Sequence, residues 1–66
     1  MCQMNIVLVH DGQQDTVMEN ASVLEVTEEG ISVSTLFEAP KLLKGAKIKK
    51  IDFLGGTVTL TAGEGV

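Results

Sequence analysis

Arginine, tryptophan and tyrosine are absent from this chain of 66 residues, and cysteine, histidine and proline each occur once. With Cys2 as its only cysteine, the chain cannot form an intramolecular disulfide. No apolar run is long enough to cross a membrane as a helix, and no secretory leader pattern is visible. We therefore expect a protein that resides in the reducing cytoplasm and has no membrane partner.

Positive charge is scarce, and all of it lies in one segment. The five cations are lysines between Lys41 and Lys50, and nine acidic residues bring the net charge to -4. Nucleic acids are bound mainly by neutralising phosphates, and base stacking needs exposed aromatic rings. The two aromatic residues, Phe37 and Phe53, lie in apolar strand-like contexts. Nucleic acid is thus not expected as the main partner. A small RNA-binding barrel that uses the Lys41–Lys50 patch remains the alternative to a solvated strand edge.

Few side chains are suited to catalysis. His10 is the only imidazole, and neither a Ser-His-Asp nor a Cys-His pattern accompanies it. The Gly55-Gly56 pair lies between two predicted strands with no helix after it, so it does not resemble a phosphate-binding loop. We therefore expect no enzymatic activity.

Short apolar stretches separated by turn residues recur along the whole chain, and no long amphipathic helix is present. They predict strands over Met4–His10, Thr16–Met18, Ser22–Glu28, Ile31–Phe37, Lys47–Leu54 and Thr57–Thr61. The expected breaks are Asp11-Gly12, Glu19-Asn20-Ala21, Glu28-Glu29-Gly30, Pro40, Gly45 and a two-residue hairpin turn at Gly55-Gly56. Lys41–Lys44 fits either a helical turn or an edge strand, and Ala62–Val66 is expected to fray.

The alternation of apolar residues predicts which side chains face the core. Leu24 and Val26 are expected to point inward, as are Val58 and Leu60. Within Lys47–Leu54, the apolar positions change parity between Ile48 and Ile51, which predicts a β-bulge at Lys49-Lys50. Met4–His10 is apolar on both faces, so we expect its second face to be covered by something else, with a second subunit as a good candidate.

These elements predict an all-β fold, a small SH3-like or Sm-like barrel of five to seven short antiparallel strands. Residues 1–66 are expected to form a single domain. A chain this short is near the lower limit at which one core folds unaided, and oligomerisation is a common remedy.

The first residues carry the most distinctive chemistry. If Met1 is removed, the amine and thiolate of Cys2 form a five-membered chelate; if Met1 stays, its amine, the Cys2 amide nitrogen and the thiolate form two fused rings. Such N/S ligands suit Ni(II) or Cu(II) better than hard ions. One chain offers too few ligands, whereas a two-fold dimer doubles them. The alternative is that Cys2 is a buried apolar residue. Met4 is assigned to packing, and His10 is either a surface residue or an extra ligand.

Several segments resemble those of a known protein family. Met1-Cys2 opens directly into an apolar strand, and Val23–Val26, Thr35–Glu38 and Gly45–Phe53 follow in order. This chain resembles the CooT family of small nickel-binding proteins over nearly its whole length. The resemblance implies a cytoplasmic homodimer with an SH3-like barrel and Ni(II) bound near the dimer interface through Cys2. It also implies a metallochaperone that serves a nickel enzyme such as carbon monoxide dehydrogenase.

Overall fold

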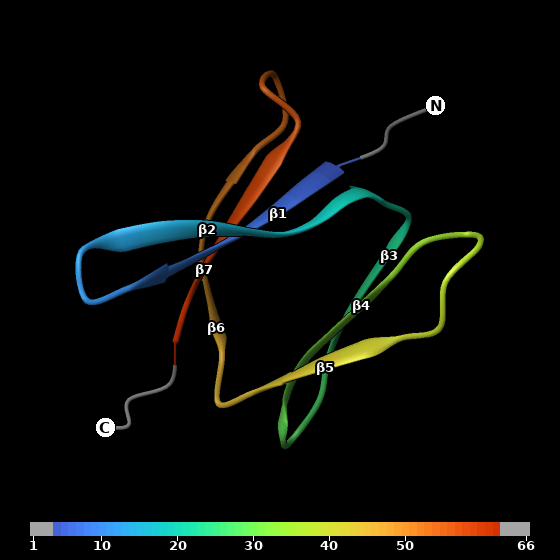
Figure 1. Cartoon of the computed structure of the whole chain (residues 1–66), viewed down its shortest axis with the longest axis horizontal. Helices are drawn as coiled ribbons and strands as arrows, with labels where there is room; N and C mark the ends of the chain where they lie inside the picture. Colours follow the sequence, from blue (N-terminus) through green and yellow to red (C-terminus); the bar gives the residue numbers. More distant parts are fainter. Residues whose placement is uncertain (1–3, 63–66) are drawn as a thin grey trace.

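The computed structural model describes residues 4–62, which form seven short strands and no helix (Figure 1). The strands are β1 (Met4–His10), β2 (Gln13–Ala21), β3 (Val23–Val26), β4 (Gly30–Ser34), β5 (Lys41–Lys44), β6 (Lys47–Asp52) and β7 (Thr57–Thr61). Four of them form a sheet in the order β2-β1-β7-β6, and three form a second sheet in the order β3-β4-β5. The all-β prediction is therefore confirmed, although the two sheets do not close into a barrel.

The two sheets are joined by two tight corners. β2 ends at Ala21 and β3 begins at Val23, so the chain passes from the edge of one sheet to the edge of the other across a single residue. β5 and β6 are joined in the same way across Gly45 and Ala46. Gly45 has φ 74°, a conformation that glycine adopts without a steric penalty. Because the linkers are so short, the two sheets are held against each other.

β1 is an interior strand. It pairs with β2 in antiparallel fashion and with β7 in parallel fashion, the latter from Asn5 opposite Thr57 to Val9 opposite Thr61. The parallel pair differs from the expectation of antiparallel strands throughout. Both edges of β1 are occupied over these residues, so its backbone cannot pair with a strand of another chain.

A single apolar core lies between the sheets. Its buried side chains come from β1, β2, β4, β7 and the β5–β6 corner: Ile6, Met18, Ala21, Ile31, Val33, Ala46, Val58 and Leu60. Leu60 and Val33 are wholly buried, and Val58 is 5% exposed, so the predicted inward positions of Val58 and Leu60 are confirmed. The alternation within each strand places these residues on the inner faces.

Two local predictions are confirmed by the backbone. Asp11 and Gly12 have positive φ angles of 52° and 77°, which is the combination required by a two-residue hairpin turn of the primed type. In β6 the register shifts between Ile48 and Lys50, which is the predicted bulge. As a result, Ile48 and Ile51 lie opposite Leu60 and Val58 and face the same side of the sheet.

Two predicted breaks are wrong in detail. β2 continues through Glu19–Ala21, because Asn20 takes a positive φ of 60° and bends the strand without ending it. β6 ends at Asp52, two residues early, and Gly55-Gly56 is the second half of a four-residue loop. In that loop the Gly55 N–H donates to Asp52 Oδ1 at 2.8 Å, and this side-chain acceptor stabilises a longer turn.

Several apolar side chains are more exposed than their sequence context predicts. Val26 lies opposite the buried Ile31, so it does face the inner side of its sheet, but it remains 68% exposed. Phe37 lies in a loop because β4 ends at Ser34, and Phe53 lies in a loop because β6 ends at Asp52. The two side chains are 92% and 83% exposed. The assignment of both phenylalanines to strands is therefore wrong. Lys41–Lys44 is resolved as an edge strand.

Candidate metal centre

Met1 and Cys2, the predicted nickel ligands, lie outside the described residues, and the structure instead fixes the strand that follows them. Met4 is half-buried and packs against the apolar core. This position agrees with the assignment of Met4 to packing. Cys2 stands two positions before Met4, the first residue of β1, so the described residues that bear on the candidate centre are those at the start of β1.

His10 lies at the opposite end of the same strand. It lies six positions after Met4, which corresponds to about 20 Å along an extended strand. Its side chain is 60% exposed, and Nδ1 lies 3.4 Å from Asp11 Oδ2. Within one chain, the structure thus does not bring His10 to the end that carries Cys2.

The second face of β1 does not require a partner chain to bury it. Val7 points away from the core, opposite Thr16 and Thr59 on the neighbouring strands, yet it is only 7% exposed in the single chain. The apolar character of both faces of β1 is therefore largely explained within one chain. Any contact between two chains near β1 has to use side chains from loops or sheet faces, because both backbone edges are paired.

Exposed apolar loops flank the start of β1. We call Leu36, Phe37, Phe53 and Leu54 the apolar rim; their exposed fractions are 76%, 92%, 83% and 100%. A backbone hydrogen bond ties one of these loops to β1, because Asn5 donates its N–H to the carbonyl of Gly56, which closes the β6–β7 loop. The Asn5 side chain contacts the neighbouring strand, where its Oδ1 accepts from the N–H of Asn20 in β2 at 3.4 Å.

The second loop faces the end of β2 across a small hollow. Asn20 lines this hollow of about 220 Å³ together with Leu36 and Phe37. Glu19 and Glu38 lie at the same hollow. The apolar rim thus contains the most exposed large apolar side chains in residues 4–62, in two loops near the N-terminal end of β1. Exposed apolar surface of this kind marks places that contact another molecule.

Among residues 4–62, no three His, Cys, Asp or Glu side chains are grouped closely enough to hold a metal ion. The same residues include no helix that could cross a membrane. The five lysines all lie on β5 and β6, the two edge strands joined at the Gly45 corner. Sequence reasoning located this basic segment, but it missed the apolar rim because Phe37 and Phe53 were assigned to strands.

Two comparisons with known proteins match nearly the whole chain. A family model described as "CO dehydrogenase accessory protein CooT" matches residues 1–61. The crystal structure of a candidate CooT protein from Carboxydothermus hydrogenoformans matches with a TM-score of 0.83 and 24% sequence identity, covering 96% of this chain and 100% of that chain. At this identity the structural match concerns the fold alone. No protein with a curated description matches.

Proposed function

Because the chain belongs to the CooT family of carbon monoxide dehydrogenase accessory proteins, we propose that it is a homodimeric Ni(II) metallochaperone that binds nickel through Cys2 of each chain. The family role is accessory to a nickel enzyme, so this chain acts in maturation and not in catalysis. Nickel is then the cargo that the protein carries.

The chemistry of the first two residues supports nickel as the cargo. The Cys2 thiolate and amine form one five-membered chelate ring if Met1 is removed, and two fused rings form with the Met1 amine and the Cys2 amide nitrogen if Met1 stays. Mixed N/S ligand sets favour Ni(II) and Cu(II) over Mg(II) or Ca(II). The family match includes both residues, since it begins at residue 1. Two chains would supply two thiolates and at least two nitrogens, which is enough for a square-planar ion.

The apolar rim supports a dimer at the same end of the molecule. Leu36, Phe37, Phe53 and Leu54 are the most exposed large apolar side chains of residues 4–62, and they lie in loops near the start of β1, the strand that follows Cys2 in the sequence. Burying two phenylalanines and two leucines from each chain would stabilise a dimer through the hydrophobic effect. A two-fold axis through this rim would bring the two Cys2 residues together.

Nickel titration of the apo protein tests the proposal directly. We expect thiolate-to-metal charge-transfer absorption that saturates at half an ion per chain, and its loss in Cys2→Ser. Titrating the protein with and without Met1, as verified by intact mass, shows which of the two chelates that the sequence allows binds nickel. His10→Gln is the matched control for a residue at the far end of β1. Equal nickel affinity in Cys2→Ser would overturn the proposal.

RNA binding is the second candidate, and one observation favours it. Phe37 and Phe53 are exposed, so aromatic rings are available for base stacking, contrary to the sequence-based argument. The lysines of β5 and β6 would supply phosphate contacts. This function predicts RNA affinity that falls steeply as the salt concentration rises. Absence of binding to an RNA oligonucleotide at low salt would remove it.

A further inference from the structure

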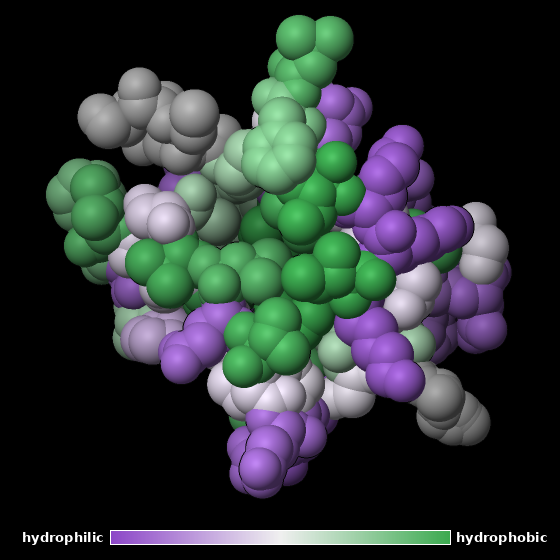
Figure 2. Space-filling model, turned by 180° about the vertical axis from the view of Figure 1, so that it is seen from behind, coloured by the Kyte–Doolittle hydropathy of each residue, from purple (hydrophilic) through white to green (hydrophobic). Residues whose placement is uncertain are grey.

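The two sheets leave one apolar side of the core open. β3 and β6 are edge strands, and their inner-face side chains Val26, Ile48 and Ile51 are 68%, 39% and 42% exposed. We call these three residues the open strip. Figure 2 shows a broad apolar area across the middle of this side of the molecule. Apolar side chains on the inner face of a sheet are normally covered by another element.

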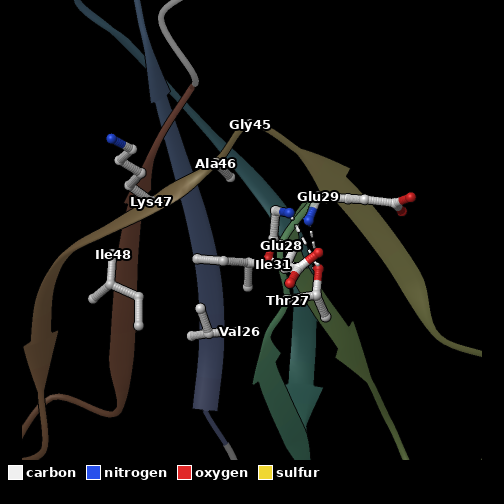
Figure 3. Close-up of a pocket in the computed structure, with 10 residues that line it drawn as sticks. Val26, Thr27, Glu28, Glu29, Ile31, Gly45, Ala46, Lys47 and Ile48 are labelled. Carbon is white, nitrogen blue, oxygen red and sulfur yellow. Dashed lines mark hydrogen bonds between the residues drawn. The ribbon is translucent and has the colours of Figure 1, made fainter.

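A hollow of about 370 Å³ lies at one end of the open strip. Val26 and Ile48 line it from β3 and β6, and Ile31 forms its floor at 1% exposed. Figure 3 shows these three side chains pointing toward the same space, whereas Lys47 points away. At this hollow the corner between β5 and β6 is tied to the β3–β4 turn, because Gly45 donates its N–H to the Glu29 carbonyl at 2.8 Å.

The outer face of β6 is basic. Lys47 and Lys50 lie opposite Thr61 and Thr59, on the side of the sheet away from the core. Lys49 and Lys50 also line an outer hollow of about 360 Å³ together with Thr57. The acidic residue in this hollow, Asp52, accepts a hydrogen bond from Gly55. β6 therefore presents isoleucine on one face and lysine on the other, beside a backbone edge that has no partner among residues 4–62.

We propose that β6 is a docking edge for an extended segment of a partner protein in which apolar residues alternate with aspartate or glutamate. Such a segment adds as a strand along β6 through backbone hydrogen bonds. Its apolar side chains cover the open strip, and its carboxylates lie beside Lys47 and Lys50, because successive side chains of a strand point to opposite faces.

Charge selects β6 over the other edge of the opening. β3 carries Glu25, and the turn after it carries Glu28 and Glu29, so an acidic segment is repelled from β3 and attracted to β6. The proposal does not depend on nickel, since the open strip and the lysines belong to β3 and β6. It can therefore be tested on the apo protein.

The probe is a short labelled peptide of alternating valine and glutamate, added to the full-length protein at low salt. Its matched control alternates valine and lysine, which keeps the apolar face and reverses the charge. We expect binding of the glutamate peptide only, with amide chemical-shift changes concentrated on β6. Equal binding of both peptides, or shifts concentrated on β2, would overturn the proposal.

Variants separate a local contact from a general charge effect. Lys50→Glu should weaken binding by roughly three- to tenfold, as expected for the loss and reversal of one exposed ion pair. Lys41→Glu makes the same change in net charge on β5 and should leave binding within twofold. Val26→Asp, at an exposed position, should weaken binding without unfolding the protein. Equal effects of Lys41→Glu and Lys50→Glu would contradict docking at β6.

A second copy of the chain or an RNA strand on the open strip would give a different experimental result. If a second copy of the chain covers the open strip, β6 amides are protected from exchange in the free protein and the peptide does not bind. If the strip serves RNA, an oligonucleotide displaces the peptide and binds more tightly. Either result would overturn the proposal.

Discussion

Gly30→Ala should be among the most destabilising single changes in this protein. Gly30 begins β4 with φ 154°, and a Cβ at this position would overlap the Leu43 carbonyl oxygen and lie 2.9 Å from the Lys44 Cα. The neighbours are backbone atoms of β5 and the corner after it, so they cannot move aside by changing rotamer. Backbone strain and overpacking together should cost about 3–5 kcal/mol.

Gly12→Ala is the matched control, because Gly12 has φ 77° but no neighbouring atom within 4 Å of an added Cβ. It should cost only about 1–2 kcal/mol, the penalty for placing alanine in a left-handed conformation. Urea unfolding followed by far-UV circular dichroism measures both variants. A small domain has a total stability on the order of 5 kcal/mol, so Gly30→Ala should retain only about 0–2 kcal/mol and unfold at a much lower urea concentration than Gly12→Ala. Equal losses in the two variants would refute the steric argument at the corner.

Leu60→Ala should cost about 3–4 kcal/mol in urea unfolding, because Leu60 is wholly buried and truncation leaves a cavity. Val23→Ala, at a position that is 54% exposed and lies outside the apolar rim, should change the unfolding free energy by less than about 1 kcal/mol, and a loss as large as that of Leu60→Ala would contradict the assigned burial. The double variant Phe37→Ser/Phe53→Ser should shift the protein toward monomer in sedimentation equilibrium; an unchanged dimer would show that the apolar rim is not the interface. Nickel affinity should fall between about pH 8 and pH 6, because protons compete for thiolate and amine, and a flat profile would exclude both ligands.

Sequence reasoning predicted the strands and the β6 bulge because these features depend on local alternation. Ile48 and Ile51 are three positions apart, and this odd spacing would put them on opposite faces of a regular strand. They can share one face only if an extra residue is inserted between them, so the spacing required the bulge. The Asp11-Gly12 turn was predictable for the same reason, since few residue pairs tolerate two positive φ angles.

Burial and strand neighbours were harder to predict, because they depend on contacts between distant segments. Val26 has the correct orientation in β3 but no element covers it, and alternation alone cannot reveal a missing neighbour. The parallel pairing of β1 with β7 joins residues about 50 positions apart, and it explains why β1 is apolar on both faces. The second face of β1, for which a second subunit was the expected cover, is thus largely buried within one chain at Val7.

The candidate site was predictable only in its chemistry. Cys2 and Met1 stand out from composition, whereas the apolar rim is formed by two loops that only the folded chain brings to β1. Phe53 was assigned to a strand because it follows the alternation of β6, but the hydrogen bond from Gly55 to Asp52 ends that strand first. A polar residue followed by glycine three positions later was the available signal for this loop.

Native mass spectrometry of the nickel-loaded protein tests the central claim most directly. The account predicts a species with the mass of two chains and one Ni(II) ion, and no nickel-bound species for Cys2→Ser. Nickel bound to single chains, or a Cys2→Ser dimer that still carries nickel, would contradict a site shared between two Cys2 thiolates.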